Sequence, residues 1–118
     1  MRMKYSPGGP GKKQAPRTWE VWLADMPAGI PVKSKRGPVA VGRRGNDGWT
    51  VYPIIPAGER DGKDAVISDL HKAGQERPSA VHVVQPVTVR GDAFVQKMGE
   101  LSEADLSKVL SGLRREGI

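Results

Sequence analysis

The residues of this chain best suited to chemistry are a group of cations followed by an indole. They are Lys33, Lys35, Arg36, Arg43, Arg44 and Trp49. The five cations bracket a predicted strand at residues 38–42, so the two groups should lie at its opposite ends, roughly 15 Å apart. Cations that bind phosphate, beside a ring that stacks on a base, are typical of single-stranded nucleic-acid sites. The plain alternative is a solvated hairpin tip without a ligand.

Other kinds of site find little support in the sequence. The chain has no cysteine, and its two histidines, His71 and His82, have no partner at metal-ligand spacing. His82 alternates with valines, which predicts a solvated side chain or one at the edge of the core. His71 is expected on a loop surface. No glycine-rich loop precedes a helix, which argues against nucleotide triphosphate chemistry. We expect neither a metal ion nor a cofactor.

The charge is spread unevenly along the chain. Residues 1–46 carry ten Lys or Arg and two acids, a balance of +8, whereas residues 47–118 balance at −2. This asymmetry favours a surface that faces a polyanion, of which nucleic acid is the commonest. Residues 1–17 are basic, rich in Gly and Pro and free of acids, which predicts a flexible arm. The alternative for this arm is a role in solubility alone. The length of the remaining segment, residues 18–118, predicts one domain.

No apolar run is long enough to span a bilayer, and the basic N-terminus lacks the apolar stretch of a secretory signal. The absence of cysteine fits a reducing compartment. We therefore expect a soluble, cytoplasmic protein that makes no contact with a membrane.

Short strands separated by turns account for most of the domain. The predicted strands cover residues 18–24, 38–42, 49–55, 65–68, 80–89 and 93–97. Pro53 favours an edge position or a bulge for the third strand, and Pro86 interrupts the longest one. Asn46, Asp47 and Gly48 supply the positive-φ positions of a hairpin turn.

The clearest local signal is a terminal helix. Ser102 and Asp105 have the spacing of a capping box, in which the serine accepts from a first-turn amide and the aspartate reaches back. Leu101 and Leu106 are placed as a hydrophobic staple. An apolar stripe follows at i, i+3, i+4 and i+7: Leu106, Val109, Leu110 and Leu113. This pattern predicts a C-terminal helix docked on a sheet.

Five or six short strands with tight turns and one terminal helix indicate a mainly β (α+β) fold, a small and strongly curved antiparallel barrel. SH3-like and OB-like barrels both have this number of elements.

The order of segments resembles the MazF/PemK (Kid) toxins of type II toxin–antitoxin systems. Five segments carry the resemblance: WEVWLAD at 19–25, RGPVAV at 36–41, TVYPII at 50–55, PSAVHVVQ at 78–85 and GELSEADL at 99–106. The ordered set, which spans about residues 18–115, is more specific than any one of them.

The resemblance implies an SH3-like barrel with helices, a homodimer, an antitoxin or other protein partner, and metal-independent endoribonuclease action on single-stranded RNA. In such chemistry the ribose 2′-OH attacks the adjacent phosphate, so charge must be stabilised and a proton delivered to the leaving oxygen. Arg36 matches the family's catalytic arginine. The expected RNA-binding residues are Lys33, Lys35, Arg43, Arg44, Trp49 and Gln85.

This chain departs from the family pattern in three places. Gly37 separates Arg36 from the proline that follows it in the family, and a one-residue shift within a strand changes the face of a side chain. Ile55 stands where a Ser or Thr is expected, and Val87 where a basic residue is frequent. Two alternatives follow: a catalytically degenerate member of the fold that binds a protein or nucleic-acid partner, and an unrelated small-barrel nucleic-acid-binding module.

Overall fold

The computed structural model describes residues 15–27, 35–59 and 64–116. Its elements are β2 (Glu20–Asp25), β3 (Arg36–Gly45), β4 (Gly48–Pro56), the 3-10 helix η1 (Ala57–Glu59), β5 (Ala65–Val66), β6 (Ser79–Val81), β7 (Val87–Val89), the 3-10 helix η2 (Gly91–Ala93), β8 (Phe94–Glu100) and the helix α1 (Glu103–Arg115). The expected basic arm lies outside the described residues except for its last three.

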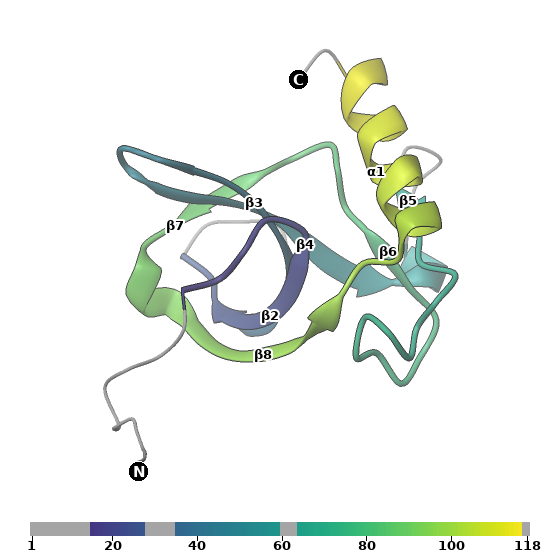
Figure 1. The fold of residues 1–118 in the computed structure, drawn as a ribbon, viewed down its shortest axis with the longest axis horizontal. Helices are drawn as coiled ribbons and strands as arrows, with labels where there is room; N and C mark the ends of the chain where they lie inside the picture. The colour runs from purple at the N-terminus through teal and green to yellow at the C-terminus, as the bar shows by residue number, and fades with distance from the viewer. Residues whose placement is uncertain (1–14, 28–34, 60–63, 117–118) are drawn as a thin grey trace, which may run out of the picture.

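The strands form one sheet of seven in the order β5-β6-β4-β3-β2-β8, with β7 also paired to β4. Every pairing is antiparallel. The sheet curls strongly without closing, and α1 lies along its β5 and β6 end (Figure 1). The predicted fold class, a strongly curved antiparallel sheet with a C-terminal helix, is confirmed.

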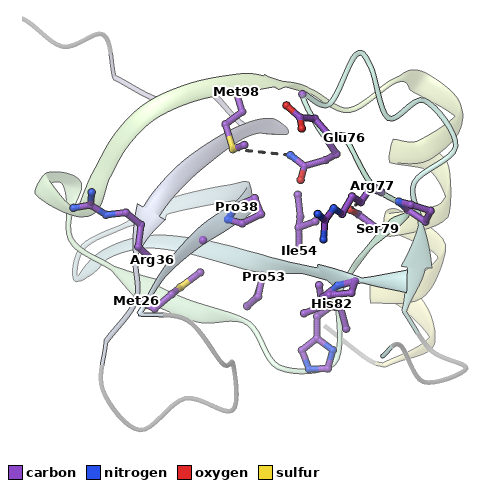
Figure 2. A pocket seen from close by; sticks show the side chains of 16 residues that line it. Met26, Arg36, Pro38, Pro53, Ile54, Glu76, Arg77, Ser79, His82 and Met98 are labelled. Atoms are coloured by element: carbon purple, nitrogen blue, oxygen red, sulfur yellow. Dashed lines mark hydrogen bonds between the residues drawn. The ribbon is translucent and has the colours of Figure 1, made fainter. Parts of the chain in front are cut away.

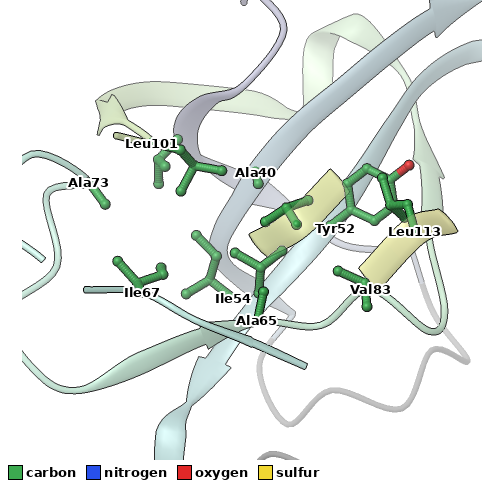
Figure 3. Close-up of a cluster of buried hydrophobic side chains, with 12 residues drawn as sticks. Ala40, Tyr52, Ile54, Ala65, Ile67, Ala73, Val83, Leu101 and Leu113 are labelled. Carbon is green, nitrogen blue, oxygen red and sulfur yellow. The ribbon is translucent and has the colours of Figure 1, made fainter. Parts of the chain in front are cut away.

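The central strands bury both of their faces. Val21, Ala40 and Ile54 belong to a cluster that also contains Val109 and Leu113 of α1, part of which Figure 3 shows. Trp22, Val39 and Val41, which are next to Val21 and Ala40 in sequence, belong to a second cluster together with Ala24, Val51, Val87, Val89 and Phe94. Successive side chains of a strand point to opposite faces. This is why β3 and β4 are continuously apolar in their middles.

The expectation of an edge position or a bulge at Pro53 is wrong, because β4 is a central strand. It pairs with β3 on one side and, on the other, with β7 at Trp49–Val51 and with β6 at residues 54–56. Pro53 falls between these two partners, where its carbonyl accepts from the His82 amide at 2.8 Å. The N–H and C=O of a strand residue point to the same side. The N–H that proline lacks would therefore point to the gap between β7 and β6, where no ladder hydrogen bond is lost.

The β3–β4 turn also differs from the expectation. Asn46 and Asp47 have negative φ, and only Gly48 of the three predicted positions has positive φ, at 136°. A Cβ at Gly48 would collide with the carbonyl oxygen of Val89. The glycine is therefore required by the close approach of β7 as well as by the turn.

One of the two hydrogen bonds of the predicted capping box at the start of α1 is present. The Ser102 hydroxyl accepts from the Asp105 amide at 3.1 Å. Instead of the reciprocal bond of a capping box, the Asp105 carboxylate accepts from the amides of Ser68 and Asp69 at 2.8 and 2.9 Å. Burial by itself would raise the pKa of Asp105, but these hydrogen bonds, with those from Ser102 and Lys108, hold it below its usual value. The residue thus ties α1 to the loop after β5.

The predicted apolar stripe is wrong at one position. Val109 and Leu113 are buried and Leu106 packs against the core, but Leu110 is exposed. The buried face instead includes Asp105 and Gly112, so it is displaced around the helix toward Asp105 relative to the predicted stripe. No helix in the described part of the chain is long and apolar enough to cross a bilayer.

Candidate functional site

A pocket of about 760 Å³ opens beside the ends of β3 and β4. Its walls come from the start of β3, the end of β4, the loop of residues 74–78 and Met98 of β8. Figure 2 shows the side chains that line it. The apolar lining includes Met26, Pro38, Pro53 and Met98, and the polar lining includes Arg36, Glu76, Arg77, Ser79 and His82.

Arg36, the predicted catalytic residue, lines this pocket at the first position of β3. The register from Arg36 to Val39 along β2 is continuous, so Gly37 is accommodated without a bulge. Arg36 therefore shares a face with Pro38, which also lines the pocket. Its guanidinium donates to the Asp25 carboxylate, from Nε at 2.6 Å and from an Nη at 3.4 Å. The hydrogen bond from Arg36 to Asp25 raises the pKa of the guanidinium, so Arg36 stays cationic.

Arg77 contributes a second guanidinium to the pocket, and it was not among the predicted site residues. It lies in the exposed segment before β6 and is followed directly by Pro78. An Arg-Pro step into an apolar strand is the motif that we matched to residues 36–41, and Arg77-Pro78 repeats it without an intervening glycine. That repetition is the signal that would have drawn attention to Arg77.

The loop that carries Arg77 is fixed to β8 through glycines. The backbone of Lys72 to Gly74 lies so close to Gly99 that a Cβ there would collide with the carbonyl oxygen of Lys72. Gly74 has φ of 71°, and the amide of Glu100 donates to the same Lys72 oxygen at 3.0 Å. The position of this pocket wall therefore depends on contacts between backbones.

Ser79 places a hydroxyl near the position where Ile55 lacks one. Ser79 pairs with Pro56 across the β4–β6 ladder, one residue beyond Ile55. It is 7% exposed, and its hydroxyl donates to the Arg77 carbonyl at 2.7 Å. The pocket thus holds a hydroxyl contributed by β6.

His82 is partly buried, which agrees with the expected position at the edge of the core, but it also has a partner that the sequence did not indicate. Its Nδ1 lies 2.9 Å from an oxygen of Asp64, and the two side chains are 19% and 1% exposed. The pairing of Ala65 with Val81 sets Asp64 opposite His82. Eighteen residues separate the two in sequence, so no local pattern indicates the contact.

Arg43, Arg44 and Trp49, which were also predicted to bind RNA, do not line the pocket. Both Arg36 and Arg43 belong to β3, which is longer than the predicted strand. The two arginines are therefore roughly 23 Å apart along the strand, farther than the expected spacing. At the hairpin end, the Arg44 guanidinium lies 5.5 Å from the Trp49 ring. Trp49 also packs edge-to-face on Phe94, which engages the ring that we expected to stack on a base.

Of the other residues predicted to bind RNA, two are exposed and one is outside the described residues. Lys35 is exposed beside Arg36, and Gln85 is exposed between β6 and β7. Lys33 lies outside the described residues. Among the residues that are described, no group of three His, Asp or Glu side chains is arranged to hold a metal ion.

Comparison with known proteins gives a structural match. No family model and no curated protein sequence matches the chain. Its structure is similar to that of the Mycobacterium tuberculosis toxin MazF-mt6, with a TM-score of 0.67 over 83% of this chain and 95% of that one. Only 16% of the aligned residues are identical, so the likeness is one of fold.

Proposed function

Because the chain has a MazF/PemK-like fold, we propose that it is a growth-inhibiting, toxin-like protein that acts on single-stranded RNA as a metal-independent endoribonuclease. The observation that carries this proposal is the pocket, which combines two guanidinium groups, Arg36 and Arg77, with apolar walls. Guanidinium groups suit the phosphates of a single strand, and apolar side chains suit its unstacked bases.

The chemistry is attack of a ribose 2′-OH on the adjacent phosphate. Charge that develops on the phosphate oxygens requires fixed donors in a site from which water is partly excluded. Arg36 is the residue we assign to this role at its end of the pocket. By likeness to toxins of this fold, a homodimer, an antitoxin partner and a cytoplasmic location belong to the same proposal.

A catalytically degenerate protein that binds RNA or a protein partner is the second candidate. The ion pair between Arg36 and Asp25 favours it, since a guanidinium already engaged by a carboxylate offers fewer donors to phosphate. The Arg36→Ala variant separates the two roles, RNA cleavage and binding without cleavage.

The proposal predicts that the purified full chain cleaves a long single-stranded RNA in the presence of EDTA and leaves 2′,3′-cyclic phosphate ends. Arg36→Ala is expected to lower kcat/KM roughly 10- to 100-fold, because a charge-assisted hydrogen bond to phosphate contributes about 1.5–3 kcal/mol. Gel analysis of end-labelled RNA under single-turnover conditions measures the effect.

Arg114→Ala is the matched control, since it removes the same charge from the exposed face of α1 and should leave the rate unchanged. Intact RNA that is bound tightly, with an affinity that falls as salt rises, would favour the binding protein instead. RNA that is neither cut nor bound would reject both roles and leave a protein partner.

A further inference from the structure

The His82–Asp64 pair, at the edge of the pocket, has a geometry that fixes a proton. Asp64 is set opposite His82 by the β5–β6 ladder, and its carboxylate is 1% exposed. An ionised carboxylate only accepts hydrogen bonds. The 2.9 Å contact from Nδ1 therefore places the imidazole proton on Nδ1.

The consequence of this tautomer is that Nε2 carries a lone pair in the neutral ring. A histidine whose Nδ1–H is held by a buried carboxylate has a fixed ring orientation and a free acceptor on its other nitrogen. His82 lines the pocket, and 19% of its side chain is exposed. The wall of the pocket at His82 thus carries an imidazole whose orientation is fixed by Asp64.

The charges that face His82 come from several elements. Asp64 faces it from the start of β5, and Glu76 and Arg77 line the same pocket from the loop before β6. Arg36 lies at the opposite side of the pocket from His82, while Arg77 reaches in from the side on which His82 lies (Figure 2). A single strand bound across the pocket would thus meet Arg77 and His82 on one side and Arg36 on the other.

We propose that His82 is the general base of this chain and that Asp64 positions it. This inference rests on the proposed endoribonuclease function. In the step, Nε2 of His82 takes the proton of the ribose 2′-OH, the bond from the 2′-oxygen to phosphorus forms and the bond from phosphorus to the 5′-oxygen breaks. Water protonates the departing 5′-oxygen, and the hydroxide that results takes the proton back from His82.

The test compares kcat and KM of the full-length wild type, His82→Ala and Arg36→Ala on single-stranded RNA in EDTA. His82→Ala is expected to lower kcat about 10²- to 10⁴-fold, the usual contribution of a general base, with KM little changed. Added imidazole should restore part of that rate. Arg36→Ala should lower kcat/KM as described above, and added imidazole should not restore its rate, because this variant loses charge stabilisation and keeps the base.

A second measurement does not depend on activity. Nitrogen-15 NMR of the neutral wild-type ring should show the proton on Nδ1, and Asp64→Asn should shift the population toward the other tautomer and lower kcat roughly tenfold or more. A ring protonated on Nε2 would overturn the proposal.

The outcomes distinguish this inference from the function on which it rests. If wild-type protein cleaves RNA and His82→Ala cleaves it at a similar rate, the base is elsewhere and only the His82 assignment fails. A folded His82→Ala variant that imidazole does not rescue indicates a structural pair and also rejects the assignment. If the wild type cleaves no RNA, both proposals fail together.

Discussion

Replacing Asp105 with alanine is expected to lower the free energy of unfolding by about 3–5 kcal/mol, because two charge-assisted hydrogen bonds to its buried carboxylate, from the amides of Ser68 and Asp69, are lost. That is a large part of the stability of a domain of this size. The same change frees the start of α1 from the loop after β5. Thermal unfolding should show a midpoint lowered by roughly 15 °C.

The comparison variant is Ser102→Ala, which removes only the local cap at the Asp105 amide. It is expected to cost about 1 kcal/mol. Equal effects of the two substitutions would contradict the idea that Asp105 acts chiefly across the structure.

Acid should remove the Asp105 contribution. Its pKa is lowered in the folded state, so the native state binds fewer protons than the unfolded chain around that pH. The stabilisation is complete above about pH 4, the ordinary range for aspartate, and is lost as pH falls through the lower folded-state pKa. Glu20 acts in the same direction, since its pKa is also lowered. The difference between wild type and Asp105→Asn in urea unfolding, followed from neutral to acid pH, isolates the part due to Asp105.

Gly99→Ala is the second substitution with a large expected effect. The added Cβ would meet the carbonyl oxygen of Lys72 and, at 2.8 Å, the carbonyl carbon of Ala73. Neither can rotate away as a side chain could, so the loop must move or the domain must absorb strain of about 1–3 kcal/mol. Because that loop continues into Arg77, we expect RNA cleavage to fall as well.

Amide exchange locates the damage. The Glu100 amide, bonded to the Lys72 carbonyl, should lose protection in Gly99→Ala before amides of the β3–β4 ladder do. Gly58→Ala is the control, since a Cβ at that position meets nothing within 4 Å. Unchanged exchange at Glu100 would show that the loop tolerates the methyl group.

The sequence predicted what is encoded locally. The Ser102 cap joins residues three apart, and the short apolar runs of β3 and β4 predict strands whatever their partners are. The real role of Asp105 depends on amides 36 and 37 residues earlier in the chain, so a local reading gave it the wrong partner. The exposure of Leu110 follows from the same contact.

The residues of the candidate site also fall into those that the sequence predicted and those that it did not. Arg36 was found through an ordered resemblance to a family, and the structure puts it on the pocket wall. Arg77 and His82 were not found, because their neighbours are set by β5 and β6, strands of two and three residues. Such short strands carry too little pattern to reveal which strand each will pair with.

The change of partner along β4 gives this strand two separate sets of bonds. Bonds to β7 hold one half of β4, and bonds to β6 hold the other, with Pro53 between them. Because the two sets share no residue of β4, we expect the bonds to β6 to open independently of those to β7. Such opening would loosen the pocket wall that carries Arg77, Ser79 and His82, while Arg36 and Met98 stay in place on β3 and β8.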